Sequence, residues 1–599
     1  MKTAPAASVY QRVFLAGAFF LLAACSFKSP LGGSQQAAPP GPATQLVTQP
    51  IATQSAKQAV ATAHPLATEA GLRILATGGS PIDAAIAAQM VLGLVEAQSS
   101  GIGGGSLIMN WDALSGKLTS YDGLSAAPAK VTAGLAIDVD GSVLTAGDVE
   151  RGGRSVGVPG TLAVLKQVHE RYGKLPWSTL FDPAIELAER GFPMPKYMHN
   201  ILATPTAAAD HPDMVPVFFG GDGKVLPIGT KVTNPAYAKT MRRIATRGPA
   251  GMWQEGAGTA LVAAMQRGVR SSLMTEADLI AYRAQPRDPV CRPFLAYTVC
   301  TMGPASFGGV VVLQILQMLE ARPSAPGNKL RFSFDDPEFV HYYAEAGRLA
   351  QADRLNYVGD PDFTRVPTAA LVAGAYVRSR ASSINPARMT KDVVPGSVEA
   401  KAASLSLELA STAETADATS QLAIADHDGN AFSMTTTNNL NFGSRLLVNG
   451  FVLNNAMTNF TAAPRPGQAA PNRVEAGKRP VTSMAPTIVF DQTGKPVVVG
   501  GSAGGGQIVD YISASLVEML ANNRTPAEAL ARGHVSTAIR GKLQLESGTS
   551  AAAQAAELRG KGHEVDVMPM VSGLGFLMRR DSGWIGAADP RRDGVALGR

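Results

Sequence analysis

TSQLAIADHDGNAFSMTTT, residues 419–437, predicts a β-hairpin. Two alternating apolar and polar strands flank Asp428-Gly429, which is a strong two-residue turn. With only those two residues in the turn, Ser420 should face Thr437, one position away from Thr419. Hydroxyl groups therefore gather at the open end of the hairpin. Threonine is a common strand former, so this pattern alone does not indicate catalysis.

The regions around the hairpin mix helices with antiparallel strands. Helices are predicted to start at Ser80-Pro81, at Asp336-Pro337 and at a capping box that begins with Thr525. Two apolar strands, Thr487–Phe490 and Pro496–Val499, flank a Thr-Gly turn. Helices interspersed with hairpins predict a mixed α/β sandwich with much antiparallel sheet.

The composition allows a large packed core. The chain has 599 residues, of which 45% are hydrophobic and 17% charged, and about four domains follow from roughly 150 residues per domain. A net charge of +6 with scattered basic residues does not favour nucleic acid as a partner. Three cysteines exclude a disulfide-rich scaffold, and eight histidines without an HExxH motif do not favour a metal enzyme. We expect no cofactor.

The amino terminus is predicted to be an export signal. Residues 13–24 form an apolar run that is too short to span a bilayer as a helix. It ends in Leu-Ala-Ala-Cys25, which resembles the lipobox of bacterial lipoproteins, and Ser26 favours the outer membrane, facing the periplasm. The alternative is an ordinary secretory signal with a chance cysteine. We expect a signal peptide over 1–24 and then a lipidated Cys25 with a flexible tether, rich in Pro, Ala and Gln, to about residue 60.

Export changes the interpretation of the other two cysteines. Residues 290–300 predict two short strands around a turn, which would bring Cys291 and Cys300 together. In an oxidising compartment a structural disulfide is favoured over two free thiols. Under either interpretation, no cysteine is a convincing nucleophile.

Two glycine clusters do not match nucleotide-binding loops. Residues 101–106 place Ser106 where the third glycine of GxGxxG should stand, and residues 500–507 lack the Lys-Ser/Thr pair of a phosphate loop. Glycine turns at strand ends also present backbone N–H groups to a ligand, as an oxyanion hole does. That interpretation remains open.

Many ordered motifs resemble the γ-glutamyltranspeptidase (glutathione hydrolase) family of N-terminal-nucleophile hydrolases, from about His64 to Gly598. The resemblance implies a four-layer αββα sandwich, made of a large subunit over 61–418 and a small subunit over 419–599. The motifs that carry it are His64-Pro65-Leu66-Ala67, Ser99-Ser100-Gly101-Ile102-Gly103-Gly104-Gly105, Gly157-Val158-Pro159-Gly160, Gly359-Asp360-Pro361, Leu453-Asn454-Asn455, Gly477-Lys478-Arg479-Pro480 and Ala588-Asp589-Pro590-Arg591-Arg592.

The resemblance implies that a proenzyme cuts itself between Ala418 and Thr419. Thr419 then becomes an amino-terminal residue, whose free α-amino group has a pKa of about 8. That amine can accept the proton of the threonine's own hydroxyl and so activate it as a nucleophile.

The resemblance also implies roles for other polar groups near the hairpin. Thr437 would hydrogen-bond the nucleophile, and the N–H groups of Gly504 and Gly505 would form the oxyanion hole. The residues expected to contact substrate are Thr482, Ser483 and Asn439.

Two departures from the family pattern concern charge. The family places an arginine two residues after the aspartate that corresponds to Asp122, but this chain has Leu124 there, followed by Ser125 in place of a glutamate. The family's amine-binding aspartate is replaced by Asn459, and Ala456 replaces a side-chain amide. Loss of a bidentate arginine and of a charge-assisted bond would cost several kcal/mol of γ-glutamyl recognition.

Three functional hypotheses follow. The first is a γ-glutamyltransferase or glutathione hydrolase, in which another cation such as Arg151, Arg154 or Arg465 holds the substrate carboxylate. The second is an amidase for a different acyl group, as in cephalosporin acylases of the same fold. The third is a self-processed envelope protein that acts by binding alone. The expected partners are a small amide substrate and the second subunit from the same precursor, with contact to the membrane only through the lipid.

Overall fold

The computed structural model describes residues 52–55, 57–132, 134–135, 137, 142, 144–267, 270–323, 331–398, 418–461, 470–537, 542–581 and 583–599. The chain divides into two units, Met1–Ala43 and Thr44–Arg599, and every described residue belongs to the second. The described residues therefore leave out the predicted signal peptide, Cys25, Arg465 and residues 399–417, which precede Ala418. Within the described part of the chain, no helix is both long and apolar enough to cross a bilayer.

Two seven-stranded sheets form the centre of this unit, and every neighbouring pair in each is antiparallel. The first has the order β1 (Ala52–Ser55), β20 (Gly583–Ala588), β19 (Gly575–Arg580), β15 (Pro496–Gly501), β14 (Thr487–Phe490), β9 (Tyr297–Thr301), β8 (Val290–Phe294). The second has the order β21 (Val595–Gly598), β2 (Ala59–Thr62), β10 (Ala418–Ala425), β11 (Ala431–Asn439), β3 (Gly105–Asp112), β4 (Lys117–Gly123), β7 (Gln285–Arg287).

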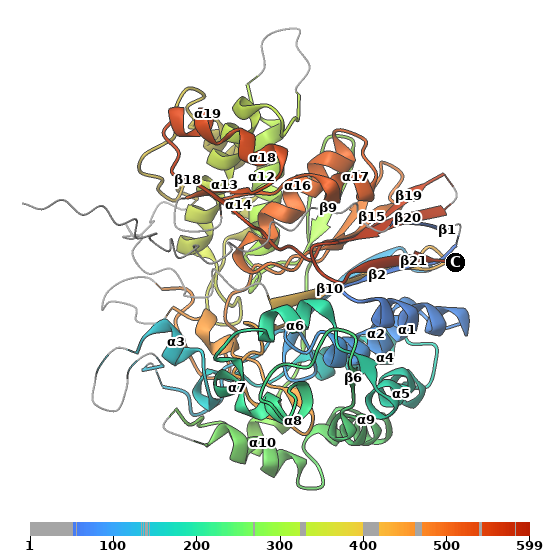
Figure 1. Ribbon diagram of the computed structural model, residues 1–599. Coiled ribbons are helices and arrows are strands. Elements are labelled where there is room, and N and C mark those ends of the chain that lie inside the picture. The colour runs from blue at the N-terminus through green and yellow to red at the C-terminus, as the bar shows by residue number, and fades with distance from the viewer. Residues whose placement is uncertain are drawn as a thin grey trace, which may run out of the picture. The chain divides into compact units, whose positions relative to one another are not determined.

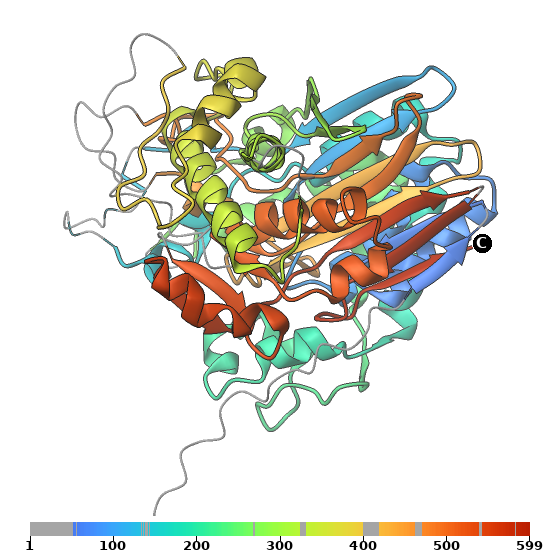
Figure 2. The same cartoon turned by 90° about the horizontal axis from the view of Figure 1, so that it is seen from above.

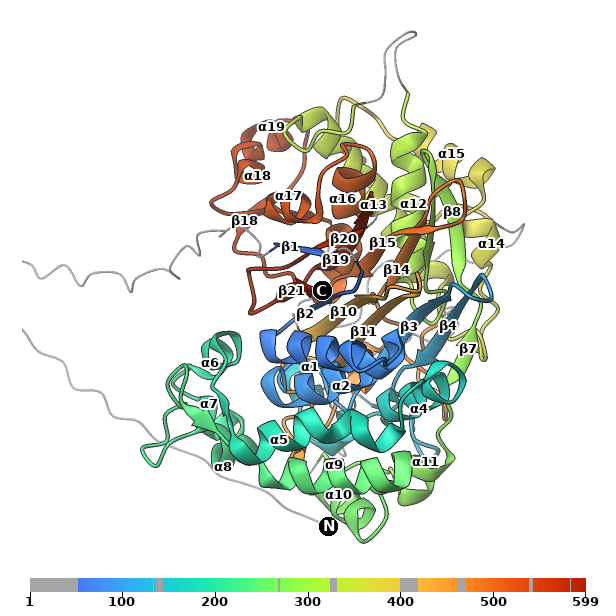
Figure 3. The same ribbon diagram turned by 90° about the vertical axis from the view of Figure 1, so that its right-hand side faces the viewer.

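Helices cover the outer face of each sheet, as Figure 1 and Figure 3 show. The second sheet is covered by α1 (Pro65–Ala76) and α2 (Pro81–Val95), and the first by α12 (Gly308–Glu320), α13 (Pro337–Tyr357) and α16 (Ile508–Leu520). Every residue of α2 is buried, which fits an Ala-rich helix between the sheet and an outer helical layer. The predicted four-layer αββα sandwich is confirmed.

The remaining elements pack around these layers, and Figure 2 gives the view of the same arrangement from above. The other helices are α3 (Ala146–Val149), η1 (Gly153–Ser155), α4 (Thr161–Tyr172), η2 (Trp177–Phe181), α5 (Asp182–Arg190), α6 (Lys196–Leu202), α7 (Ala207–Asp210), η3 (Pro212–Met214), α8 (Val215–Phe218), α9 (Pro235–Arg247), η4 (Gly248–Met252), α10 (Ala257–Met265), α11 (Glu276–Ala281), α14 (Thr368–Leu371), α15 (Gly374–Ser382), η6 (Ala456–Asn459), η7 (Gly505–Gln507), α17 (Pro526–Ala531), α18 (Ser550–Ala553) and α19 (Ala555–Gly560). The other strands are β5 (Phe192–Pro193), β6 (Lys231–Val232), β12 (Leu447–Val448), β13 (Phe451–Val452), β16 (Val535–Ser536), β17 (Leu543–Glu546) and β18 (Val565–Met568).

The predicted hairpin is present as β10 and β11, but its predicted register is wrong by one residue. Ser420 pairs with Thr436 rather than with Thr437. The turn is longer than two residues because the Asp426 carboxylate accepts hydrogen bonds from the backbone N–H groups of Asp428 and Asn430. A β-bulge where β10 passes through Thr419 then shifts the register again, so that Ala418 pairs with Asn439.

Two further predictions concern the sheet edges. Strand β1, residues 52–55, pairs with β20, so the expected tether to about residue 60 is wrong at its carboxyl end. Edge strands are held by backbone hydrogen bonds, so a stretch with few apolar side chains can still join a sheet.

The predicted disulfide is present. Cys291 and Cys300 face one another on β8 and β9, and a disulfide joins them.

Candidate active site

Three groups converge where β10 begins. The Thr419 hydroxyl lies 2.5 Å from the carbonyl oxygen of Ala418, the residue before it. The Thr437 hydroxyl on β11 donates to the same carbonyl oxygen at 2.6 Å and lies 3.2 Å from Thr419 Oγ1. Thr437 Oγ1 also accepts from the backbone N–H of Asn439 at 2.8 Å, which fixes its orientation. The predicted proximity of Thr419 and Thr437 is therefore present in the structure, although the pairing register differs.

This arrangement suits an attack on the Ala418–Thr419 peptide bond. The nucleophile and the carbonyl group it would attack belong to adjacent residues, and both residues are buried, with 4% exposure for Thr419. The Thr437 hydroxyl polarises that carbonyl by hydrogen bonding to its oxygen. These two adjacent residues thus supply a hydroxyl nucleophile and the carbonyl group that it would attack.

The glycine turn after β15 has a backbone that only glycine adopts readily. Gly504 and Gly505 have φ of 127° and 56°. A Cβ atom on Gly504 would also lie 2.5 Å from the Tyr511 ring. The turn leads through η7 into α16, so its N–H groups lie at the amino end of a helix, where negative charge is stabilised.

The packing of the two sheets brings this glycine turn and the hairpin together. Gln421, two residues after Thr419, contacts Gly501 at the end of β15. The Ser433 hydroxyl on β11 donates to the carbonyl of Gly500 at 2.8 Å. Polar contacts between the inner faces of the sheets therefore place the end of β15 opposite the beginning of β10.

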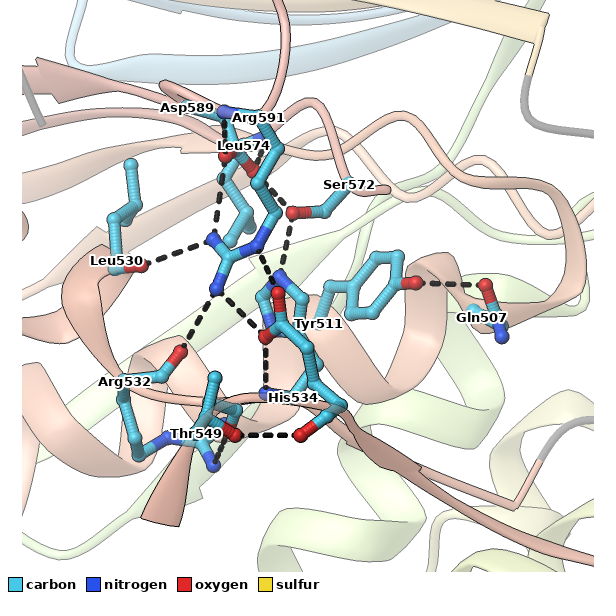
Figure 4. Close-up of polar contacts among 12 residues, drawn as sticks. Gln507, Tyr511, Leu530, Arg532, His534, Thr549, Ser572, Leu574, Asp589 and Arg591 are labelled. Atoms are coloured by element: carbon cyan, nitrogen blue, oxygen red, sulfur yellow. Dashed lines mark hydrogen bonds and ion pairs between the residues drawn. The ribbon is translucent and has the colours of Figure 1, made fainter. Parts of the chain in front are cut away.

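The C-terminal motif is linked to the glycine turn through Tyr511, and Figure 4 shows the polar contacts around Tyr511, His534, Ser572 and Asp589. The Tyr511 ring, which touches Gly504, packs on the His534 ring with centroids 4.3 Å apart. His534 Nε2 lies 2.6 Å from the hydroxyl of Ser572, which in turn donates to Asp589. Ser572 lies between the histidine and the aspartate, so this is not a nucleophilic triad, in which the histidine is central.

A buried ion pair completes that support. Arg591 donates to both carboxylate oxygens of Glu546, at 2.7 and 2.8 Å, and lies 3.3 Å from Asp589. The sequence showed the Asp-Pro-Arg motif at residues 589–591 but assigned no role to it. Its contacts show that it connects the chain end to the oxyanion candidate.

The predicted substrate hydroxyls and Asn439 already have internal partners. Ser483 Oγ donates to the Gly505 carbonyl at 2.6 Å, which ties it to the glycine turn. Thr482 Oγ1 accepts from the Met484 N–H at 3.3 Å. Asn439 has a left-handed φ of 80°, and its side-chain amide donates to Thr458 Oγ1 at 2.8 Å. Ser483 and Thr482 are 8% and 9% exposed, so each has little surface available to a ligand.

The side chains that replace the family's charged residues are neutral and largely enclosed. Leu124 is 5% exposed and packs in the hydrophobic core. Ser125 Oγ and Asn459 Oδ1 are buried polar atoms without a hydrogen-bond partner among the described residues. Such atoms are uncommon in folded proteins, and a bound ligand is one way to satisfy them.

Asp122, two residues before Leu124, belongs to an ion cluster that sequence reasoning missed. Arg287 lies 3.5 Å from Asp122 and 2.7 Å from Asp362, and Arg479 lies 3.5 Å from Asp122. Arg287 also lies 3.5 Å from Asp360. Burial raises the pKa of Asp122, and the two guanidinium groups oppose that rise. The motifs at residues 359–361 and 477–480 could have indicated the cluster, since each contributes a charged residue to it.

The cations proposed as substitutes for the missing arginine are also engaged. Arg151 forms an ion pair with Asp210 at 3.1 Å. Arg154 donates to the carbonyl of Ile137 at 3.0 Å. Arg465 lies outside the described residues.

Comparisons with known proteins identify relatives of this chain. The model of the family described as Gamma-glutamyltranspeptidase matches residues 67–599. The glutathione hydrolase proenzyme of Bacillus subtilis (strain 168) is 31% identical over 554 residues, which cover 90% of this chain and 91% of that protein. The acylase ACY 1 proenzyme of Pseudomonas sp. (strain SE83) is 33% identical over 549 residues, which cover 90% and 93%.

Solved structures agree with that comparison. A cephalosporin acylase from Bacillus halodurans shares the fold, with a TM-score of 0.77 at 24% identity over 94% of this chain and 99% of that one. A Helicobacter pylori gamma-glutamyltranspeptidase chain has a TM-score of 0.50 at 31% identity and covers 56% of this chain and 94% of its own length. Relatives named for glutathione hydrolysis and relatives named as acylases are thus similar to this chain to about the same degree.

Proposed function

Because the chain belongs to the gamma-glutamyltranspeptidase family, we propose that it is an amidase that cleaves itself between Ala418 and Thr419. Members of this family are proenzymes that divide into two subunits and act on small amides. The observation that carries the proposal is the position of the Thr419 hydroxyl, 2.5 Å from the Ala418 carbonyl oxygen. The products would be subunits ending at Ala418 and beginning at Thr419.

Self-cleavage would proceed through an ester. The Thr419 oxygen attacks the Ala418 carbonyl carbon, the peptide C–N bond breaks, and the hydroxyl proton passes to the departing nitrogen, which becomes the α-amine of Thr419. Water then attacks the ester carbonyl, leaves a carboxylate on Ala418 and returns a proton to the Thr419 oxygen. Thr437 stabilises the negative charge on the Ala418 oxygen during the first step.

Turnover would repeat the same chemistry on a substrate. The α-amine of Thr419 accepts the hydroxyl proton, the oxygen attacks the substrate amide, and the proton passes to the amine that leaves. Water or a second amine then attacks the acyl ester and releases the enzyme. The N–H groups of Gly504 and Gly505 would stabilise the oxyanion in both steps.

The acyl group that these residues favour carries no α-ammonium. Asn459 is neutral where the family has an aspartate, Leu124 and Ser125 are also neutral, and Arg287 and Arg479 are held by aspartates. The ammonium of a γ-glutamyl group would be desolvated there without a carboxylate partner, whereas a glutaryl group has no ammonium. The acylase relatives, at 33% identity, support this donor class.

A γ-glutamyl amide such as glutathione is the second candidate donor. It is supported by the glutathione hydrolase relatives, which are 31% identical over most of the chain. It requires a cation for the substrate carboxylate, and Arg465 remains a candidate for that role.

The test begins with the purified protein. Two bands and an amino-terminal Thr419 on the smaller one are expected, followed by turnover of a glutaryl anilide in preference to a γ-glutamyl anilide. Thr419→Ala should abolish cleavage and turnover, whereas Thr419→Ser, which keeps a hydroxyl, should retain both. Turnover by Thr419→Ala would refute the nucleophile. Self-cleavage without turnover of either anilide would favour the binding-only envelope protein, and preferential γ-glutamyl turnover would favour the second candidate.

Export and lipid attachment form a separate part of the proposal. The apolar run over 13–24 followed by Cys25 supports a lipid anchor facing the periplasm. Cys25→Ala should move the protein from the membrane fraction to the soluble fraction if the lipid is the anchor. An unchanged distribution would favour an ordinary secretory signal.

A further inference from the structure

A buried carboxylate lies behind the candidate nucleophile. Glu96 follows α2 directly and is fully buried. Ser420, the residue after Thr419, donates its hydroxyl hydrogen to Glu96 Oε2 at 3.4 Å. The hydroxyl of Ser100 donates to Ser420 Oγ at 2.9 Å. A chain of polar groups thus connects the end of α2 to the first residues of β10.

A buried cation connects the same carboxylate to the Thr419 main chain. Arg592 Nη1 donates to the Thr419 carbonyl oxygen at 2.7 Å and lies 4.0 Å from Glu96 Oε2. The guanidinium group packs over the Tyr197 ring, 4.7 Å from its centroid, and the Arg592 side chain is 1% exposed. One guanidinium therefore lies between Glu96 and the nucleophile's own carbonyl.

We propose that Glu96, acting through Ser420 and Arg592, is a positioning residue that fixes the main chain of Thr419 when its carboxylate is ionised. The proposal rests on the proposed role of Thr419 as nucleophile. An ionised Glu96 balances the charge of Arg592 and accepts from Ser420, so both neighbours of the Thr419 backbone are held. A neutral Glu96 removes one of the two carboxylates that interact with Arg592, the other being Asp593, and losing a counter-charge is costly for a buried cation.

The electrostatic surroundings of Glu96 bring the protonation of its carboxylate close to neutral pH. Burial raises the pKa of Glu96 to about 7, and the positive charge of Arg592 opposes that rise. Hydrogen bonds from the side chains of Ser99 and Gln98 also oppose it, whereas the negative charge of Asp593 adds to it. Asp593 is itself held by the backbone N–H of Tyr197 and faces Lys196.

Two groups must then lose a proton for full activity, Glu96 and the α-amine of Thr419. The α-amine has an ordinary pKa of about 8. A plot of log kcat against pH should therefore approach a slope of about 2 on its acid side, since both deprotonations limit the rate. If only the amine mattered, the slope would be about 1.

Glu96→Gln is the direct test, because it keeps the shape of the side chain and removes its charge. We expect an acid-side slope of about 1, a kcat about tenfold lower above pH 8, and a KM within about twofold of the starting protein. Glu345→Gln is the matched control, since Glu345 is also buried and paired with an arginine, Arg348 at 2.6 Å, but lies on α13 in the opposite helical layer. The control should keep the slope of the unmodified enzyme.

An unchanged pH profile in Glu96→Gln would overturn the proposal, as would a slope of about 1 in the unmodified enzyme. If Glu96→Gln does not yield folded protein, Ser420→Ala decides, because it leaves both charges in place. It should lower kcat about threefold or more with KM unchanged, and a normal kcat would overturn the proposal. Failure of the proposed function is distinct, because turnover by Thr419→Ala, or no turnover of either anilide, would reveal it.

Discussion

The nucleophile end of β10 differs in chemistry from the candidate pocket wall, by which we mean Leu124, Ser125 and Asn459, the neutral residues that stand where the family has charged ones. At β10, hydroxyl and backbone groups are concentrated within 3.2 Å of one another around the Ala418 carbonyl. At the wall, Leu124 is buried and the neighbouring charges are consumed in the cluster around Asp122. Under the proposed function, bond cleavage and recognition of the acyl group would be separate parts of this molecule, and the first would operate whichever acyl group the second accepts.

The largest expected effect concerns the nucleophile end. Thr437→Ala removes the hydroxyl that donates to the Ala418 oxygen at 2.6 Å, while Thr437→Ser keeps it. Loss of one such donor costs about 10²- to 10³-fold in rate, so self-cleavage of Thr437→Ala should slow by that factor. The rate is measured from the appearance of the two bands over time. Cleavage at the normal rate would show that Thr437 is only a strand residue.

The next effect concerns the pocket wall. Asn459→Asp restores a negative charge where the family has an aspartate, with almost no change in shape. The ratio of kcat/KM for γ-glutamyl over glutaryl anilide should rise about a hundredfold, since a charge-assisted bond is gained to the ammonium that only the γ-glutamyl group carries. Self-cleavage should stay normal. A ratio that does not move would place Asn459 away from the acyl group and weaken the division into two regions.

Sequence reasoning succeeded where the relevant contacts are local. The hairpin predicted that Thr437 lies beside Thr419, because the two residues belong to adjoining strands of one short segment. The register was wrong by one, since the bonds of the Asp426 side chain to the loop lengthen the turn and a bulge at Thr419 compensates. Neither feature has a sequence signature that outweighs Asp428-Gly429.

Contacts between distant segments could not be predicted in the same way. Asp122 and Arg287 are brought together by the pairing of β4 with β7, two strands far apart in the sequence, and Arg479 joins them from a third segment. The resemblance identified the neutral residues Leu124 and Asn459 as departures. It gave no reason to expect that Arg287 and Arg479 form ion pairs with aspartates. Strand β1 was missed for a related reason, because backbone pairing with β20 needs no apolar pattern.

The smallest expected effect tests whether the charges beside the wall belong to the fold or to the substrate. Arg479→Lys keeps the positive charge but loses the planar fork that lies 3.5 Å from Asp122 and donates to the Arg283 carbonyl at 2.9 Å. Weakening this buried cluster should lower the free energy of unfolding by about 1 to 2 kcal/mol and the thermal midpoint by a few degrees, with KM for both anilides unchanged. Calorimetry and steady-state kinetics on the same preparation separate the two effects. A KM that rises for both anilides, which share this carboxylate, at constant thermal midpoint, would mean that Arg479 binds the substrate carboxylate and that recognition does use a charge.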